Sequence, residues 1–485
     1  MRVDKTLLQL TVFAFLILAL TILFTLLGWD STVYLLSAEH FLGKDVYFDN
    51  NAPRILSQIV ATVWKLTGIS ETVARLISVL MSVGLLVATY LIANELFNKR
   101  VALFAFLFLL LNPLFLLYSS KVYTDISLAL IITITTYLFY TGLVKDRPVN
   151  LMFSGVFIAI AVLIKYPGLI LYFITASFIL LKERKAIKNP YLWLSYLISL
   201  MLLIPSMSQF SGGVINYAST FPYLTEIQNP HYFITLPLIL LTATPLFVLL
   251  LLKKRMKLFE GNYLILLLTI FFIFGFYQIV SSKDIRYLLP LFPSVFILAS
   301  KGLDEMISKK LPETFEKIRI NFKKIFIEIF LLPLIASFIL LFFDFYYKPN
   351  SIIQAAQYLK PVEGSLIISN YWPEISFYSQ KTTKWFPSTE EKLHQQMSEF
   401  KIDYVVAVET KKLPTELRIL GIYTDSEPIW VQIKNIDSLS FLTKVKQLED
   451  NLMITAVYKF NENIPNRTLV NVTDKLSLAE LLPNN

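Results

Sequence analysis

A series of long apolar segments restricts the fold of this chain more than any other feature of the sequence. A helix needs roughly 20 apolar residues to cross a bilayer. The shorter segments on either side of Lys165 and the segment 287–300 meet this length least well. About eleven spans, and hence a mainly α, polytopic membrane protein, are therefore expected. The apolar segments lie near residues 7–27, 73–93, 101–118, 126–144, 151–164, 166–181, 191–207, 232–252, 262–280, 287–300 and 325–347.

The composition agrees with this reading. Only 16% of the 485 residues are charged and 55% are hydrophobic, whereas soluble proteins carry roughly 25% charged residues. The net charge of +9 is interpreted as an orientation signal rather than a nucleic-acid footprint. Because the chain has no cysteine, disulfides, iron–sulfur clusters and thiolate zinc sites are excluded.

Lys and Arg residues are concentrated in alternate loops. "KERKAIK" (182–188), "KKRMK" (253–257) and the 301–324 loop are basic, as is the start of the chain, whereas the loop 208–231 has no Lys or Arg. Basic loops stay in the cytoplasm. The sequence therefore predicts an integral plasma-membrane protein with a cytoplasmic N-terminus and an outward-facing region after residue 348.

The composition changes at about that point, which predicts two domains, a transmembrane domain at 1–347 and an extracytoplasmic α/β domain at 348–485. "GSLIISN" (364–370), "IDYVVAVE" (402–409) and "ITAVYKF" (454–460) are typical of buried strands. "TEEKLHQQMSEF" between them favours a helix. Two glycosylation sequons, at Asn466 and Asn471, agree weakly with an outward location.

The loop 28–72 is the longest outward loop between the predicted spans. It contains two amphipathic stretches, at about 31–42 and 54–67, around the polar turn "GKDVYFDNNAP". Amphipathic helices of this kind lie in the membrane interface. The pattern fits either a surface cap without chemistry or the border of a site that opens on the lipid.

Four ionisable residues lie at predicted helix ends on the outer side. They are Asp30, Asp125, Lys165 and Arg286. Structural ion pairs would explain any two of them, because charges at membrane depth usually pair. Four such groups on different loops favour a polar site instead.

Several segments resemble, in order, the signatures of one enzyme class. Arg75 lies in the second of them, and an acid follows the first span. The resemblance is to membrane glycosyltransferases of the GT-C class, specifically the protein-mannosyltransferase and aminoarabinose-transferase superfamily. The matching segments are "YLLSAEHFLGKDVYFDNNAP" (34–53), "ETVARLISVLMSVGLLVATYLIANELF" (71–97), "LNPLFLLYSSKVYTDISLAL" (111–130), "GVFIAIAVLIKYPGLIL" (155–171) and "RYLLPLFPSVFILAS" (286–300).

The resemblance implies inverting transfer of a sugar from a polyprenyl-phosphate donor, dolichyl-phosphate-like, to a protein, lipid or glycan acceptor on the outer face. Asp30 and Asp125 would be catalytic, with Asp30 as the general base that takes the acceptor's proton. Arg286 and Lys165, with Arg54 assisting, would bind the donor phosphate. The chain departs from the family where Asp30-Ser31 replaces Asp-Glu. It departs again where Arg54 follows a single proline, in place of a lysine before paired prolines.

No cofactor is expected, and a divalent metal is possible but not required. Glu39 and His40 are adjacent, so their side chains would point about 100° apart on a helix. Membrane lipid is an expected partner and nucleic acid is not. The alternative function is a transporter or flippase for a lipid-linked or anionic substrate, although midplane polar sites and repeat halves are more typical of that class. A non-catalytic scaffold that presents the C-terminal domain is the third reading.

Overall fold

The computed structural model divides into two compact units. Unit 1 comprises Met1–Thr25 and Asn50–Phe343, and unit 2 comprises Leu26–Asp49 and Asp344–Asn485. Each unit is described separately. The structure describes residues 5–46, 55–206, 260–280, 284–308, 322–346, 350–362, 366–387, 389–410, 436–451 and 453–461.

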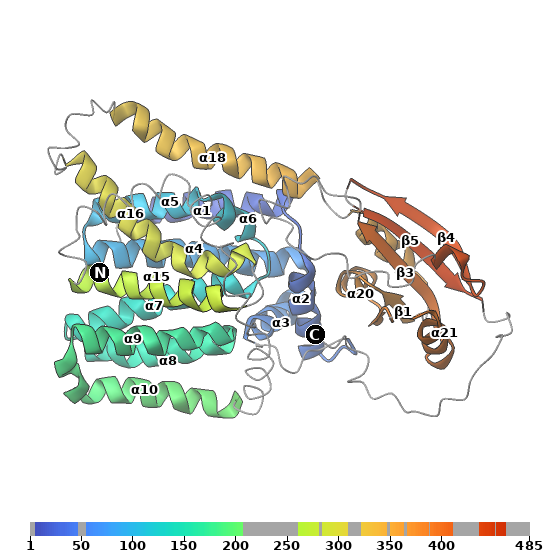
Figure 1. Ribbon diagram of the computed structural model, residues 1–485, viewed down its shortest axis with the longest axis horizontal. Helices are drawn as coiled ribbons and strands as arrows, with labels where there is room; N and C mark the ends of the chain where they lie inside the picture. The colour runs from blue at the N-terminus through green and yellow to red at the C-terminus, as the bar shows by residue number, and fades with distance from the viewer. Residues whose placement is uncertain are drawn as a thin grey trace. The chain divides into compact units, whose positions relative to one another are not determined.

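The described residues of unit 1 form helices joined by short turns and contain no strand. In Figure 1, most of its long helices run side by side in roughly the same direction. The helices are α1 (Lys5–Phe24), α3 (Ile55–Thr67), α4 (Glu71–Leu96), α5 (Lys99–Leu110), α6 (Pro113–Tyr118), α7 (Thr124–Val144), α8 (Pro148–Ile164), α9 (Ile170–Leu181), α10 (Pro190–Leu203), α15 (Gly261–Ile279), α16 (Phe292–Ile307) and α18 (Phe322–Tyr346), with short 3-10 helices at η1 (Tyr166–Leu169), η2 (Arg184–Lys188), η3 (Ile204–Ser206) and η4 (Ile285–Leu291).

Five helices in the described residues are long and apolar enough to cross a membrane. They are α1, α4, α7, α15 and a stretch that begins at Phe330 within α18. Shorter apolar helices include α3, α8 and α10. The prediction of a polytopic, mainly α membrane protein is confirmed. The number of eleven spans stays a prediction, and the segment 232–252 lies outside the described residues.

The predicted segment 101–118 forms two helices, because the chain breaks at Asn112–Pro113. The Asn112 side chain accepts a hydrogen bond from the Phe115 backbone N–H at 3.0 Å, and proline occupies the first helical position of α6. Both are strong helix-start signals. A similar break divides 287–300, where η4, which contains Pro290, precedes α16.

The chain reverses direction between α8 and α9 at "KYPG". Lys165 is extended, with φ −161° and ψ 133°, and Pro167 follows in η1, so the helix cannot continue through this turn. A Cβ on Gly168 would lie 2.3 Å from the backbone carbon of Ala161. Only glycine allows η1 to pack this closely on the end of α8, and this packing fixes the position of Lys165.

Unit 2 contains a five-stranded mixed sheet with the order β2-β1-β3-β5-β4. β1 is parallel to β2 and β3, while β5 is antiparallel to β3 and β4. The three strands and the helix expected from the sequence are confirmed as β1, β3, β5 and α21. The elements are α2 (Trp29–Phe41), α19 (Asn350–Leu359), β1 (Leu366–Ser369), α20 (Trp372–Ser379), β2 (Thr383–Trp385), α21 (Glu390–Glu399), β3 (Ile402–Thr410), η5 (Ile436–Ser438), β4 (Leu442–Glu449) and β5 (Met453–Phe460).

Successive residues of the central strands point to opposite faces of the sheet. Ile367 and Val406 pack with residues of α19 and α20 on one face. Ile368 and Val405 pack with residues of α21 on the other. The result is a three-layer α/β/α unit with a separate apolar core on each side of the sheet.

The segment Leu26–Asp49, which carries α2, belongs to unit 2. The Leu26 N–H donates to Asp344 Oδ2 at 3.1 Å, and Lys44 Nζ donates to Gln380 Oε1 at 2.6 Å. Thr382 Oγ1 donates to the backbone carbonyl of Asp45 at 3.1 Å. The domain boundaries 1–347 and 348–485 stay a prediction, but α2 groups with the C-terminal residues rather than with the helices that follow it.

Candidate functional site

Asp125 joins two cations in unit 1. Lys165 Nζ lies 2.6 Å from Asp125 Oδ1, and Arg286 Nε lies 3.7 Å from Asp125 Oδ2. Asp125 and Arg286 are 161 positions apart in the sequence, yet the three residues meet at the ends of three different helices. The structure therefore brings together three of the five residues that the sequence singled out.

Helix ends position each member of this group, which we name the Asp125 cluster (Asp125, Lys165, Asp284 and Arg286, with Tyr123 and Tyr287). Asp125 lies in the first turn of α7, where the helix dipole favours a negative charge. Lys165 follows the last residue of α8, and Arg286 is the second residue of η4. All three elements change direction here, so polar side chains can gather without interrupting an apolar helix.

Asp284 is a member of the cluster that sequence reasoning missed. Its Oδ1 accepts the Arg286 backbone N–H at 3.0 Å, and its Oδ2 lies 2.9 Å from Arg286 Nε. The acid thus caps η4 and folds the arginine side chain back at the same time. An aspartate two residues before an arginine, at a predicted helix start, was the available signal.

Two tyrosine rings lie against the cations and were also missed. Arg286 Cζ lies 4.3 Å from the centre of the Tyr123 ring, and Lys165 Nζ lies 4.3 Å from that of Tyr287. Tyr277 stacks on Tyr287, with 5.3 Å between ring centres. Aromatic faces attract cations and shield them from water, so they orient both cations. Tyr287 directly after Arg286 and Tyr123 two residues before Asp125 were the signals in the sequence.

The cluster is largely buried. The Asp125 side chain is 2% exposed, and those of Lys165 and Arg286 are 13% and 10% exposed. Charges in such surroundings interact more strongly than on a surface. The arginine can grip a phosphate through two N–H groups and the lysine can add a point charge, which makes the group chemically suited to an anionic ligand.

Arg75, the arginine embedded in one of the family-like segments, is not part of this cluster. Its Nη2 donates to the Thr25 carbonyl at 2.8 Å, and its Nε donates to the Ser120 carbonyl at 3.1 Å. Its Nη1 lies 3.2 Å from Glu71 Oε1. The guanidinium therefore links the end of α1, the start of α4 and the loop before α7, which is a structural role.

Asp30 lies in unit 2, in the first turn of α2. The neighbouring Trp29 packs edge-on against Tyr371, Trp372 and Trp385, with ring centres 5.9, 5.9 and 5.8 Å away. Glu374 of α20 is also nearby. Burial raises the pKa of Glu374 to about 8, and the negative charge of Asp30 contributes to this rise.

The remaining candidates differ in outcome. Arg54 lies outside the described residues. Glu39 is buried and pairs with Lys44 at 3.2 Å, while His40 is exposed. Within the residues that the structure describes, no group of three or more His, Asp or Glu side chains is arranged to hold a metal ion. The roles of all five predicted site residues, and the expected independence from metal, stay predictions.

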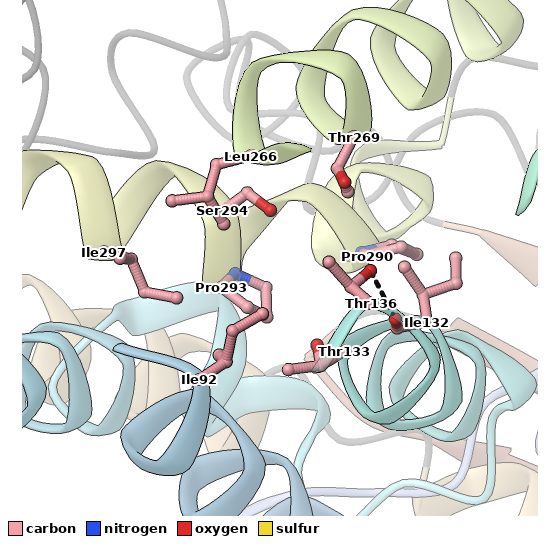
Figure 2. Close-up of a pocket in the computed structure, with 10 residues that line it drawn as sticks. All are labelled: Ile92, Ile132, Thr133, Thr136, Leu266, Thr269, Pro290, Pro293, Ser294 and Ile297. Atoms are coloured by element: carbon pink, nitrogen blue, oxygen red, sulfur yellow. Dashed lines mark hydrogen bonds between the residues drawn. The ribbon is translucent and has the colours of Figure 1, made fainter. Parts of the chain in front are cut away.

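A small void lies elsewhere in unit 1, between α4, α7, α15 and the start of α16. Figure 2 shows its ten lining residues, which are isoleucine, leucine, proline, threonine and serine. Its volume is about 220 Å³ including open space. The hydroxyls of Thr133, Thr136 and Thr269 each donate to a carbonyl of their own helix at 2.8 Å. Because none of the lining residues is charged, the void offers no cation that could bind a phosphate.

Solved structures with the same fold are membrane enzymes. ArnT from Cupriavidus metallidurans bound to undecaprenyl phosphate aligns over 94% of this chain and 98% of its own, with a TM-score of 0.65 and 15% identity. The oligosaccharyltransferase AglB from Archaeoglobus fulgidus, in complex with an inhibitory peptide and a dolichol-phosphate, aligns over 83% of this chain and 69% of its own (TM-score 0.58, 11% identity). The arabinofuranosyltransferase AftD from Mycobacteria aligns over 95% of this chain and 40% of its own, with a TM-score of 0.55 and 13% identity.

This chain has the fold of the GT-C class of membrane glycosyltransferases. Two parts of its sequence match family models. Residues 51–208 match the family model of dolichyl-phosphate-mannose-protein mannosyltransferases, and residues 229–366 match that of the Alg9-like mannosyltransferase family. No curated protein matches the chain. The resemblance to the protein-mannosyltransferase and aminoarabinose-transferase superfamily is confirmed.

Proposed function

We propose that the protein is an inverting glycosyltransferase that moves a sugar from a polyprenyl-phosphate donor to an acceptor on the outer face of the plasma membrane. The Asp125 cluster carries this proposal, because two cations at 2.6 and 3.7 Å from one buried carboxylate fit a phosphate. The undecaprenyl phosphate and dolichol-phosphate of the structural neighbours support a lipid-phosphate donor.

The proposed reaction is a single displacement. The acceptor hydroxyl attacks the anomeric carbon, a new carbon–oxygen bond forms, and the bond from that carbon to the phosphate oxygen breaks. Asp30 takes the hydroxyl proton. The lipid phosphate leaves with an additional negative charge, which Arg286 and Lys165 stabilise. Arg54 assists them in this proposal, and no metal is required.

Asp125 has a different part in this scheme. Its carboxylate already contacts both cations, so taking up a proton there would weaken two ion pairs. We assign to it the orientation of Lys165 and Arg286 and of a sugar or acceptor hydroxyl. A hexose or a pentose, and a protein, lipid or glycan acceptor, all remain compatible with these groups.

A transfer assay tests the class. Radiolabelled polyprenyl-phosphate sugars are incubated with purified protein in lipid, and label is followed into protein, lipid and glycan fractions. Transfer in wild type and its loss in Arg286→Ala would support the enzyme. A matched control is Lys145→Met, which breaks an ion pair with Glu95 at the opposite end of α7 and should leave transfer intact. Movement of the intact donor across the bilayer without transfer would favour a flippase.

The proposed orientation has its own test. A reporter that is active only outside the cytoplasm is fused after residue 360, and a second one near the N-terminus. We expect activity only from the first fusion, since the basic loops at 253–257 and 301–324 are predicted to be cytoplasmic. An inactive reporter after residue 360 together with an active one near the N-terminus would overturn the outer-face assignment.

A further inference from the structure

The start of α2 is held by the C-terminal part of unit 2. Trp29 is the residue directly before Asp30, and it contacts three aromatic rings that lie more than 340 residues later in the chain. The interplanar angles are 74°, 85° and 80°. Edge-to-face contacts of this kind are directional, so three of them restrict the rotation of the indole as well as its position.

The helix has no cap of its own at this point. Gly28 occupies the N-cap position, and no side chain there accepts a hydrogen bond. A helix start without a side-chain cap frays easily. The aromatic contacts of Trp29 therefore supply the constraint that the local sequence lacks.

The residues that contact Trp29 are themselves held by the core of unit 2. Trp29 packs against the apolar core that includes Tyr371, Ile375 and Val457. Tyr371 and Trp372 are 7% and 8% exposed, and Glu374, the nearby carboxyl, lies in the same turn of α20. Trp385 comes from β2, an edge strand of the sheet. The Trp29 indole is therefore held by residues of α20, of β2 and of the apolar core between α20 and the sheet.

We infer that Trp29 is a positioning residue for Asp30, and that Tyr371, Trp372 and Trp385 of the C-terminal domain set the orientation of this carboxylate through it. This inference rests on the proposed function, in which Asp30 is the base. It gives the C-terminal domain a part in catalysis, since the domain would aim the proton acceptor at the attacking hydroxyl. A displacement of about 1 Å at a reacting group can cost about 10²-fold in rate.

Trp385→Ala is the variant of choice, because Trp385 is half-buried on an edge strand and its loss disturbs the core least. We expect kcat for transfer to fall by about 10²-fold, with the donor KM within about threefold of wild type. Trp385→Phe restores an aromatic edge and should recover most of the rate. The matched control is Phe441→Ala, which removes a buried ring that packs on His394 and Phe460 in the other core, and it should leave kcat within about threefold.

Hydrogen exchange provides a readout that does not depend on activity. In the full-length protein, the peptide 26–34 should exchange faster in Trp385→Ala than in wild type, and at the wild-type rate in Phe441→Ala. Unchanged exchange in Trp385→Ala, or equal effects of both variants on this peptide, would overturn the inference. Absence of transfer by wild type would instead contradict the proposed function, and the exchange result would still decide whether the C-terminal domain holds the start of α2.

Discussion

The two carboxylates that we propose to be catalytic, Asp125 and Asp30, lie in contrasting surroundings. Asp125 is buried in unit 1 and contacts two cations. Asp30 lies in unit 2, beside a tryptophan held by aromatic rings and near the buried carboxyl of Glu374. A carboxylate between two cations is suited to holding those cations in position. In our proposal Asp125 therefore positions the two cations, and the role of general base falls to Asp30.

The largest expected effect concerns Asp30. Asp30→Asn keeps the shape of the side chain but cannot accept the acceptor's proton, so transfer should fall by about 10²–10⁴-fold. Donor binding should stay near the wild-type value. Transfer rates and donor affinity are measured on the same purified protein. Near-wild-type transfer would return Asp30 to a helix-start role, where asparagine serves as well.

Asp125→Asn should instead reduce stability and transfer together. Removing one partner of a buried ion pair costs about 3–5 kcal/mol, and here two cations lose their carboxylate. Thermal unfolding of the variant in detergent measures the loss. Glu95→Gln breaks the more exposed Lys145–Glu95 pair and should cost only about 0.2–1 kcal/mol. Equal losses in both variants would remove the distinction between the Asp125 cluster and an ordinary ion pair.

Arg286→Lys and Arg75→Lys together compare two arginines that are buried in the described part of unit 1. An ammonium cannot grip a phosphate through two N–H groups, so donor affinity should weaken by about tenfold. Arg75→Lys, which disturbs contacts to Thr25 and Ser120, should lower the unfolding temperature but leave donor affinity unchanged. Donor binding is measured by titration with a polyprenyl phosphate. An unaltered affinity in Arg286→Lys would reduce this arginine to a partner of Asp125 and Asp284.

A further prediction concerns the pH dependence of unit 2. The pKa of Glu374 rises from 4.5 to about 8 in the folded protein, so the folded state holds this proton more tightly than the unfolded state. The contribution of Glu374 to the free energy of unfolding is therefore fully present below about pH 4.5. It is lost as the pH rises to about 8, and the free energy of unfolding falls by at most about 1.4 kcal/mol per pH unit in that range. Glu374→Gln should flatten this dependence of the unfolding temperature. Glu390→Gln, on the exposed start of α21, should leave it unchanged.

The sequence predicted much of the fold because period and polarity are local signals. The apolar lengths indicated the helices, and the strands at 364–370, 402–409 and 454–460 followed from their apolar runs. The edge strands β2 and β4 were missed. β2 is only three residues long, and β4 has mostly exposed side chains, so neither gives a buried pattern.

The candidate site was predictable only in part. Asp125, Lys165 and Arg286 were selected because charges at apolar helix ends are costly. Asp284 and the tyrosines were missed because their contribution depends on where the Arg286 side chain lies in the folded protein, beside Asp284 and over the Tyr123 ring. The grouping of α2 with unit 2 was also missed, since Trp29 finds its partners more than 340 residues away.

That grouping has a consequence for synthesis in the cell. The segment Leu26–Asp49 leaves the ribosome early, but the residues that complete unit 2 begin at Asp344. At about 5–20 residues per second, the segment waits roughly 15–60 s for them. Trp29 and the leucines that α2 buries in the folded protein meanwhile need cover from lipid or a chaperone. The proposed base, Asp30, is oriented only when the C-terminal strands have folded. A chain truncated before those strands would therefore insert its helices without acquiring activity.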